Sequence, residues 1–352
     1  MITKAIRTLS LLLVFVSSTS IAQQVAVSDK VVNADRYPET RVSFPGGVVG
    51  LPKVTFYSPA GRAVWLDLYL PPRTSSGAAS PFIVYMHGGG WSGGTARTTG
   101  TFENWPSVLA SIAAKGYVVA SVDYRLSGEA KFPAAAQDIK AAIRWLRTNA
   151  TTYHVDKSRG LVWGPSAGGH LAALVAMSCG AAELEPVAPQ GQRGAQPATP
   201  PAPLESDCVQ AAVGWYGIYD LQLDAAQAVS AARANPQQGE SGLARFLGCS
   251  ISACAPSVIR AANPVSYVDP TDPPMLIIHG DADRTASPQH SKTLYELLKS
   301  KGVRTELIML PKIGHSWIGE THDATIEASR SALEKTLAFI DATIGSGKSV
   351  QR

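Results

Sequence analysis

The 352-residue sequence lacks any apolar run that approaches the roughly 20 residues required by a membrane-spanning helix. It also lacks an excess of charge, because only 16% of its residues are charged and the formal net charge is +4. Internal repeats and a second domain boundary are absent as well. The composition therefore gives no case for membrane insertion or for binding nucleic acid. With 45% hydrophobic residues, the chain is expected to be globular with a large core.

Residues 1–22 form a separate unit. Lys4 and Arg7 precede an apolar run over residues 9–16, and small residues surround the end of the segment at Ala22. This pattern predicts a cleaved secretory signal peptide, so we expect a secreted or periplasmic protein. The residue directly after the predicted cleavage site is Gln23 and not a cysteine, which argues against a lipid anchor. Cleavage would lower the basic count from 31 to 29 against 27 acidic residues, a net charge of +2.

Cysteine is scarce, with four residues in the chain. An even count in an exported protein favours disulfides, and three pairings are possible. We favour Cys179 with Cys208 and Cys249 with Cys254, because each pair brackets a local loop. Neither spacing is that of a zinc site and no histidine stands at ligand spacing from the pairs, so no metal is expected.

Apolar, β-branched runs alternate with longer amphipathic stretches from residue 54 onward. This alternation predicts an α/β fold, with a doubly wound and mostly parallel sheet of about eight strands and helices on both faces. Helices are expected over residues 133–149 and from Pro288 to a stop at Gly302. The expected strands span residues 54–57, 63–70, 82–87, 117–123, 160–163, 211–215, 275–279 and 305–310.

The predicted strands place a single domain at residues 54–345, preceded by an N-terminal segment over residues 23–53. Inside the domain, residues 181–207 are rich in proline and have neither helical nor strand periodicity. We interpret them as an exposed insert tethered by Cys179 and Cys208. Two hypotheses stay open for this insert, namely a flap over a nearby pocket and a mobile surface loop.

The sequence Gly-Pro-Ser-Ala-Gly-Gly at residues 164–169 follows a predicted strand and precedes an apolar, helical stretch. A strand that runs through Gly-x-Ser-x-Gly into a helix is typical of a nucleophile elbow. Side chains at Gly164 or Gly168 would clash in such a tight turn. Ser166 is therefore predicted to project above the sheet at a helix N-terminus as a nucleophile.

A second glycine cluster, His-Gly-Gly-Gly-Trp at residues 87–91, ends another predicted strand. Consecutive glycines let backbone amides approach a ligand without side-chain obstruction. The amides of Gly88 and Gly89, together with that of Ala167, are predicted to hold a developing oxyanion. The alternative is an ordinary glycine turn.

A serine nucleophile needs a base, and the base needs an acid to hold it. His315 follows the last predicted strand on a short, glycine-bearing loop, which makes it the predicted base, with His322 in reserve. Asp281 and Asp283 both lie just after a strand, where the sites of α/β proteins collect. Structural roles are expected for the remaining histidines outside the glycine cluster, namely His154, His170, His279 and His290.

At this point the chain resembles the α/β-hydrolase superfamily, and within it the carboxylesterases related to hormone-sensitive lipase and to bacterial feruloyl and acetyl-xylan esterases. The resemblance covers roughly residues 60–342. Its matching elements are residues 87–91, 123–126 with 132–134, 164–169, 279–283 and 314–315. It implies these roles without any cofactor: Ser166 as nucleophile, Asp283 as acid, His315 as base, and the amides of Gly88, Gly89 and Ala167 as oxyanion hole.

Two departures from the lipase-like branch stand out. Pro165 occupies the position where that branch usually carries aspartate, which moves the match toward the feruloyl-esterase-like branch. Residues 23–53 lack the helical periodicity of an N-terminal cap, so a minimal cap and an open site are expected. Four aromatic residues beside the motifs are predicted to stack against an acyl group or a sugar, the alternative being ordinary packing: Trp91, Trp215, Tyr216 and Trp317.

The resemblance and the motifs together imply a serine carboxylic-ester hydrolase that acts through an acyl-enzyme. We expect polysaccharide or small-molecule esters as partners, either plant-type feruloyl or acetyl esters or small aromatic and short-chain esters. A serine peptidase of the prolyl-oligopeptidase type is the first rival, although only about 40 residues separate the predicted cleavage site from the first matching strand. The second rival is a non-catalytic binding protein on the same fold. The sequence indicates no oligomeric state.

Overall fold

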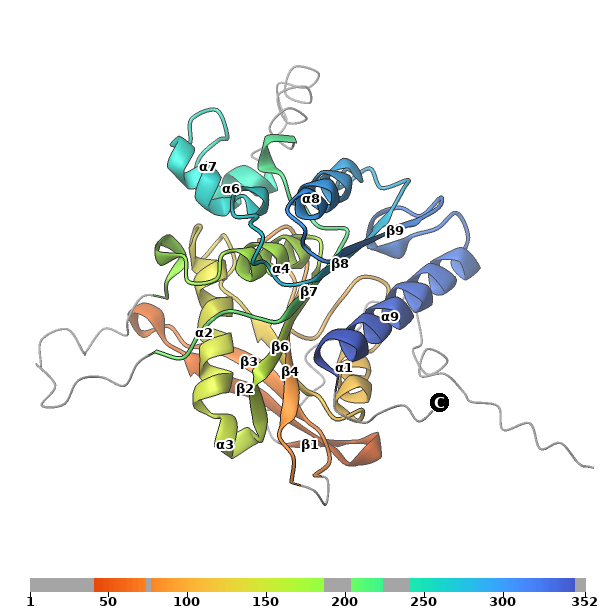
Figure 1. Ribbon diagram of the computed structural model, residues 1–352. Helices are drawn as coiled ribbons and strands as arrows, with labels where there is room; N and C mark the ends of the chain where they lie inside the picture. Colours follow the sequence, from red (N-terminus) through yellow and green to blue (C-terminus); the bar gives the residue numbers. More distant parts are fainter. Residues whose placement is uncertain (1–40, 74–76, 187–203, 224–240, 346–352) are drawn as a thin grey trace, which may run out of the picture.

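The computed structural model describes residues 41–73, 77–186, 204–223 and 241–345 (Figure 1). The predicted signal peptide and residues 187–203 of the Pro-rich insert lie outside these ranges. Over the described residues, no helix has the length and apolarity needed to cross a membrane.

A single twisted sheet of nine strands forms the centre of the described part, in the order β1-β2-β3-β5-β4-β6-β7-β8-β9. The strands from β5 to β9 in this order pair in parallel, whereas β1, β2 and β3 add antiparallel pairs at one edge. The predicted α/β fold class is confirmed, and each of the eight expected strands is present. The strands are β1 (Val42–Phe44), β2 (Val48–Tyr57), β3 (Val64–Leu70), β4 (Ser80–Met86), β5 (Val118–Asp123), β6 (Val155–Pro165), β7 (Ala211–Trp215), β8 (Met275–Gly280) and β9 (Thr305–Leu310).

The sheet begins earlier in the chain than expected, because β1 and the first half of β2 fall in the segment 23–53 that we placed before the domain. A bulge interrupts β2 between Leu51 and Val54, where the pairing with β3 shifts. Lys53 lies in this bulge with a positive φ of 53°, and its amide donates to Asp67 Oδ1 at 2.9 Å. The bulge breaks the alternation of apolar and polar residues that a strand prediction relies on.

Helices cover both faces of the sheet (Figure 1). Along β4, Phe82, Val84 and Met86 pack in the core shared with α2, α4 and α8, while Ile83 and Tyr85 pack in the core shared with α1 and α9. This split follows from the two-residue period of a strand, and both faces are apolar because both are covered. The helices are α1 (Trp105–Ala113), α2 (Ala134–Thr148), α3 (Ala150–Tyr153), α4 (Ala167–Met177), α6 (Gly242–Leu247), α7 (Pro256–Ala262), α8 (Gln289–Ser300) and α9 (His322–Ile344). Short 3₁₀ turns lie at Pro45–Gly47, Pro59–Gly61, Ala182–Leu184, Pro264–Ser266 and His315–Trp317.

The two helices predicted from periodicity agree with the structure. The first, expected over residues 133–149, is α2. The second is α8, which ends at Ser300, and Gly302 follows with a φ of 78°. A residue without a Cβ adopts this left-handed conformation at little cost, which explains the stop.

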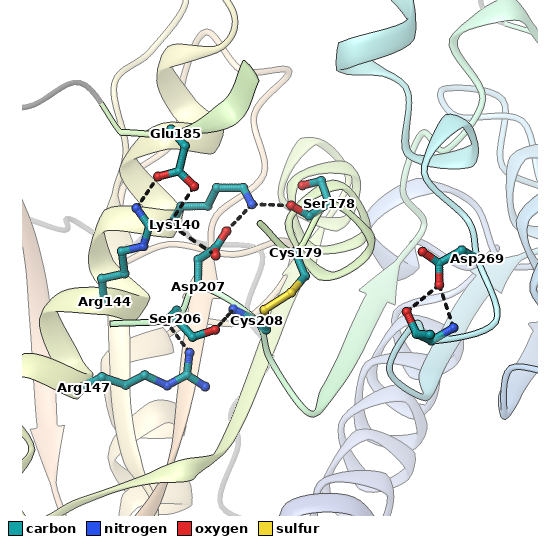
Figure 2. Close-up of a disulfide and its surroundings, with 11 residues drawn as sticks. Lys140, Arg144, Arg147, Ser178, Cys179, Glu185, Ser206, Asp207, Cys208 and Asp269 are labelled. Carbon is teal, nitrogen blue, oxygen red and sulfur yellow. Dashed lines mark hydrogen bonds and ion pairs between the residues drawn. A yellow bond between two sulfur atoms is a disulfide. The ribbon is translucent and has the colours of Figure 1, made fainter. Parts of the chain in front are cut away.

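Both predicted cysteine pairs form disulfides. Cys179 bonds Cys208 across 29 residues, with Cα atoms 4.7 Å apart, and Cys249 bonds Cys254 with Cα atoms 5.3 Å apart. The first bridge joins the two ends of the Pro-rich insert directly after α4 and shortly before β7 (Figure 2). In the chain-entropy view, closing a loop of this length contributes roughly 3 to 4 kcal/mol.

A buried lysine reinforces the same junction (Figure 2). Lys140 of α2 is fully buried, and its ammonium donates to the carbonyl of Ser178 at 2.6 Å and pairs with Asp207. Arg144, one turn further along α2, pairs with Glu185 and contacts Asp207 at 3.4 Å. Removing the Asp207 carboxylate alone would leave the buried ammonium of Lys140 without its counterion, which would lower the free energy of unfolding by about 3 to 5 kcal/mol. The insert is thus fixed to α2 at both of its ends.

Candidate active site

Ser166 sits at the sharp turn between β6 and α4. Its backbone has φ 53° and ψ −119°, a strained conformation for a residue with a side chain. A Cβ at Gly164 would lie 2.5 Å from the backbone of Gly168, and one at Gly168 would lie 2.2 Å from the carbonyl oxygen of Met86. A side chain on either of these glycines would therefore clash, as predicted. The turn places the hydroxyl of Ser166 above the carboxyl ends of the strands.

The loops after β8 and β9 lie against each other and bring an aspartate to a histidine. A Cβ at Gly280 would lie 2.1 Å from the carbonyl oxygen of Ile313, so only glycine fits this contact. Asp281 Oδ1 accepts a hydrogen bond from the Lys312 amide at 2.6 Å. Asp281 thus stabilises the contact between the two loops, and Asp283 is left to face the site.

The structure brings the predicted trio together in one hydrogen-bonded chain. His315 Nδ1 donates to Asp283 Oδ2 at 2.7 Å, and the Ser166 hydroxyl lies 3.0 Å from His315 Nε2. With a proton on Nδ1, the other ring nitrogen accepts the hydroxyl proton of the serine. Chain order and geometry are those of a nucleophile, a base and an acid. His322, the reserve candidate, begins α9 instead.

Asp283 is held as a carboxylate by its surroundings. Burial favours the neutral form and raises its pKa, but hydrogen bonds from His279 and His315 and from the Ala286 amide outweigh burial. The net effect holds the pKa of Asp283 well below its ordinary value. The amides of Thr285 and Ala286 donate to its Oδ1 at 2.8 and 3.0 Å, which fixes the carboxylate in one orientation.

His279 is a contact that the sequence prediction missed. It is fully buried at the end of β8, and its Nε2 lies 3.3 Å from Asp283 Oδ2 and 3.0 Å from the carbonyl oxygen of Ala286. Both neighbours are acceptors, so Nε2 carries the proton, and Nδ1 accepts from the Ser291 hydroxyl at 2.6 Å. The signal was its position four residues before Asp283, at the end of the same strand.

The glycine cluster after β4 lies beside Ser166. Gly88 packs so closely that a Cβ there would lie 3.2 Å from the carbonyl oxygen of Pro165, and Gly89 has a φ of 110°. In the described part of the chain, the amides of Gly88, Gly89 and Ala167 donate no hydrogen bond to another residue. The structure thus leaves three donors available beside the serine, one of them at the N-terminus of α4.

Buried aromatic groups support this glycine cluster from below. The Tyr124 hydroxyl donates to the carbonyl of His87 at 2.9 Å, and the two rings stack with centroids 4.2 Å apart. Burial lowers the pKa of His87 to about 4, so its ring is neutral at neutral pH. A neutral, stacked ring introduces no charge next to the amides that face Ser166.

A cavity of about 810 Å³ opens in front of these groups. Among the four aromatic residues predicted to line it, Trp91 and Tyr216 do so, although each is only 2% exposed. Trp91 stacks on Phe246 and donates to His170 Nδ1 at 3.2 Å, and His170 is thus the packing residue we expected. Two of the four predicted aromatic residues therefore line the cavity.

The prediction is wrong for Trp215 and Trp317, which are fully buried and do not line the cavity. Trp215 donates its indole proton to Thr336 of α9 at 2.9 Å and packs edge-on against Trp317. Trp317 packs in turn against the ring of Tyr216. The space between the sheet and α9 needs large apolar side chains, and both indoles fill it.

Comparison with known proteins places the chain among esterases by similarity. The BD-FAE family matches residues 66–298. Esterase LipQ of Mycobacterium tuberculosis is 29% identical over 262 residues, which are 74% of this chain and 56% of that protein. Ethyl acetate hydrolase of Pseudomonas putida is 32% identical over 158 residues, covering 45% of this chain and 46% of that one. The chain spans about half the length of the curated relatives it matches.

Solved structures extend the likeness to nearly whole chains. A truncated carbohydrate esterase from gut microbiota is 25% identical, with a TM-score of 0.62 over 83% of this chain and 95% of that one. Esterase 2 of Thermogutta terrifontis, at 23% identity, has a TM-score of 0.62 over 85% of this chain and 94% of that one, and it shows a shared fold. The predicted resemblance is confirmed, and the chain belongs to the BD-FAE family within the α/β-hydrolase fold.

Proposed function

We propose that this chain is a serine carboxylic-ester hydrolase. The observation that carries the proposal is the hydrogen-bonded chain from Ser166 through His315 to Asp283, which faces an open cavity beside three unengaged amides. The names of its relatives, among them esterases and an ethyl acetate hydrolase, agree with this chemistry.

The reaction has two steps. Ser166 Oγ attacks the ester carbonyl while His315 Nε2 accepts the hydroxyl proton, and the tetrahedral oxyanion is held by the amides of Gly88, Gly89 and Ala167. The C–O bond to the alcohol then breaks, and His315 returns the proton to the leaving oxygen. Water attacks the acyl-enzyme by the same route, so the acid is released and the serine regains its proton.

Each part contributes a definite share of the rate. An oxyanion donor of this kind is worth about 3 kcal/mol in acyl transfer, a factor of roughly one hundred or more. The Asp283 carboxylate keeps the proton of His315 on Nδ1 and stabilises the charged ring that forms during attack. Because the carboxylate is already oriented by backbone amides, little reorganisation is needed during the reaction.

The substrate class we propose is an ester of the plant-polysaccharide type, feruloyl or acetyl, or a small aromatic or short-chain ester. The structural relative from gut microbiota is described as a carbohydrate esterase. Three hydroxyl-bearing residues, Ser241, Thr285 and Ser316, are among those that line the cavity, which suits an oxygen-rich substrate. Two disulfides agree with secretion or a periplasmic location, which we propose on the same footing.

The test compares the purified mature protein with Ser166→Ala on short-chain nitrophenyl esters, methyl ferulate, acetylated xylan and a prolyl peptide. We expect ester turnover in the wild type, a burst of the first product, and an acyl adduct on Ser166 in the intact mass. The variant removes one oxygen at a half-exposed site, so it should fold normally and lose turnover by a factor on the order of 10⁴ or more. Peptide turnover would instead support the peptidase, and no turnover at all would support a binding protein.

A further inference from the structure

Arg284 is the feature of the cavity that the proposed reaction does not use. It directly follows Asp283, is exposed, and lines the cavity. Apart from His315, it is the only ionisable side chain other than a tyrosine among the lining residues within the described ranges, and no carboxylate is among them. The rest of that lining is glycine backbone, hydroxyl groups and apolar or aromatic side chains.

The backbone of Arg284 is held in place by the hydrogen bonds of its neighbours. The Asp283 amide donates to the carbonyl of Gly280 at 3.3 Å, and its carboxylate accepts from the two amides that follow Arg284. The backbone of Arg284 is therefore held in the same tight loop that presents the carboxylate to His315. Its guanidinium makes no hydrogen bond or ion pair with any residue in the described ranges.

We propose that the cavity selects esters that carry a carboxylate, and that Arg284 binds this carboxylate. The inference rests on the proposed ester hydrolysis and narrows the proposed substrates to those that carry a carboxylate. A guanidinium presents a planar fork that pairs with a carboxylate through two parallel hydrogen bonds. Among the described lining residues, an anionic substrate meets the guanidinium of Arg284 and no carboxylate.

The carboxylate can belong to the alcohol half of the ester or to the acyl half, and two matched substrate pairs separate these sources. For the alcohol half, 4-acetoxybenzoate is compared with the neutral 4-acetoxybenzamide. For the acyl half, the mono-4-nitrophenyl ester of succinate is compared with 4-nitrophenyl butyrate. The measured quantity is the ratio of kcat/KM for the charged member to kcat/KM for the neutral member in each pair.

Three variants make the test specific. Arg284→Gln removes the charge, Arg284→Lys keeps the charge but loses the fork, and Arg245→Gln removes an exposed arginine of α6 that does not line the cavity. We expect Arg284→Gln to lower the ratio about tenfold in at least one pair, equivalent to ~1.4 kcal/mol. Arg284→Lys should retain part of the preference. Arg245→Gln should leave kcat/KM for each of the four esters, and hence the ratio in each pair, unchanged.

The outcomes distinguish this inference from the function on which it rests. A wild type that hydrolyses the neutral esters, with a ratio that Arg284→Gln changes less than twofold, overturns the carboxylate proposal alone. An equal loss on both members of a pair also overturns it, because Arg284 would then serve the loop and not the substrate. A wild type inactive on all four esters removes the proposed function, and this inference with it. Raising ionic strength from about 0.01 M to about 1 M should shrink the wild-type ratio, since it shortens the Debye length from roughly 30 Å to 3 Å.

Discussion

Replacing His279 by leucine tests how far catalysis depends on the groups that orient Asp283. His279 shares its Nε2 proton between Asp283 at 3.3 Å and the carbonyl of Ala286 at 3.0 Å. A hydrogen bond to a charged group is worth about 1.5 to 3 kcal/mol, and a shared proton belongs at the low end of that range. Losing about 1.5 kcal/mol raises the pKa of Asp283 by roughly one unit.

The variant should therefore keep Asp283 ionised at neutral pH, because His315 and two backbone amides still donate to it. Its carboxylate would be less firmly oriented, so we expect kcat to fall about tenfold with KM unchanged, as for any residue that touches no substrate. Stability should fall by about 3 kcal/mol, because Ser291 and Ala286 lose their buried partner. The Asp283 share of that loss is fully present at neutral pH, and it disappears only as the pH falls through the pKa of Asp283 in the folded state, which lies well below the ordinary value.

The assay measures kcat and KM on a neutral ester, together with urea unfolding at pH 7. His279→Gln restores an amide donor and should recover part of kcat. Ser291→Ala removes only the group that holds the ring tautomer, so its effect on kcat should be smaller than that of leucine. A kcat within twofold of the wild type despite reduced stability would refute the reasoning, since His279 would then only fill space.

Three further predictions concern residues that support the site. Gly168→Ala should abolish activity or folding, because the added Cβ would lie 2.2 Å from a backbone oxygen. The control Gly128→Ala, whose Cβ would have no neighbour within 4 Å, should leave both unchanged. Circular dichroism and ester turnover check both variants. Asp123→Asn should stabilise the fold by about 1 to 2 kcal/mol at pH 8, since burial raises the pKa of Asp123 to about 6. In urea unfolding, this gain should vanish below pH ~4, because the carboxyl of Asp123 is then protonated in both the folded and the unfolded chain. Replacing Cys179 and Cys208 by serine should cost roughly 3 to 4 kcal/mol in urea unfolding, and an unchanged midpoint would contradict the tether.

The parts of the site that depend on local turn chemistry were predictable from the sequence. The two glycines around Ser166 and the short loop of His315 encode their own backbone geometry, and the expected chain order supplied the partner. The choice of Asp283 over Asp281 depended on the family resemblance. The structure gives its physical reason, because the Asp281 side chain is occupied by the Lys312 amide.

Features that depend on packing between distant segments were not predictable. Trp215 and Trp317 lie beside catalytic motifs in the sequence, but α9 arrives from the far end of the chain and buries them. The hydrogen bond of His279 depends on the curl of a loop that brings a residue four positions away back onto the strand end. The first half of β2 was not predicted, because the bulge at Lys53 interrupts the alternation of side chains along the strand. The bulge is defined by the pairing of β2 with β3 and not by residues adjacent in the sequence.

The junction beneath the Pro-rich insert has a consequence for protein engineering. Cys179 and Cys208 hold the two ends 4.7 Å apart at Cα, and Lys140 anchors the same point to α2 through Asp207. A folded module with adjacent termini, spliced between residues 186 and 204, would be carried on an insert whose base this disulfide already closes. The closure entropy of a loop grows only slowly with its length, so the sheet can carry a sizeable graft there, such as a carbohydrate-binding domain.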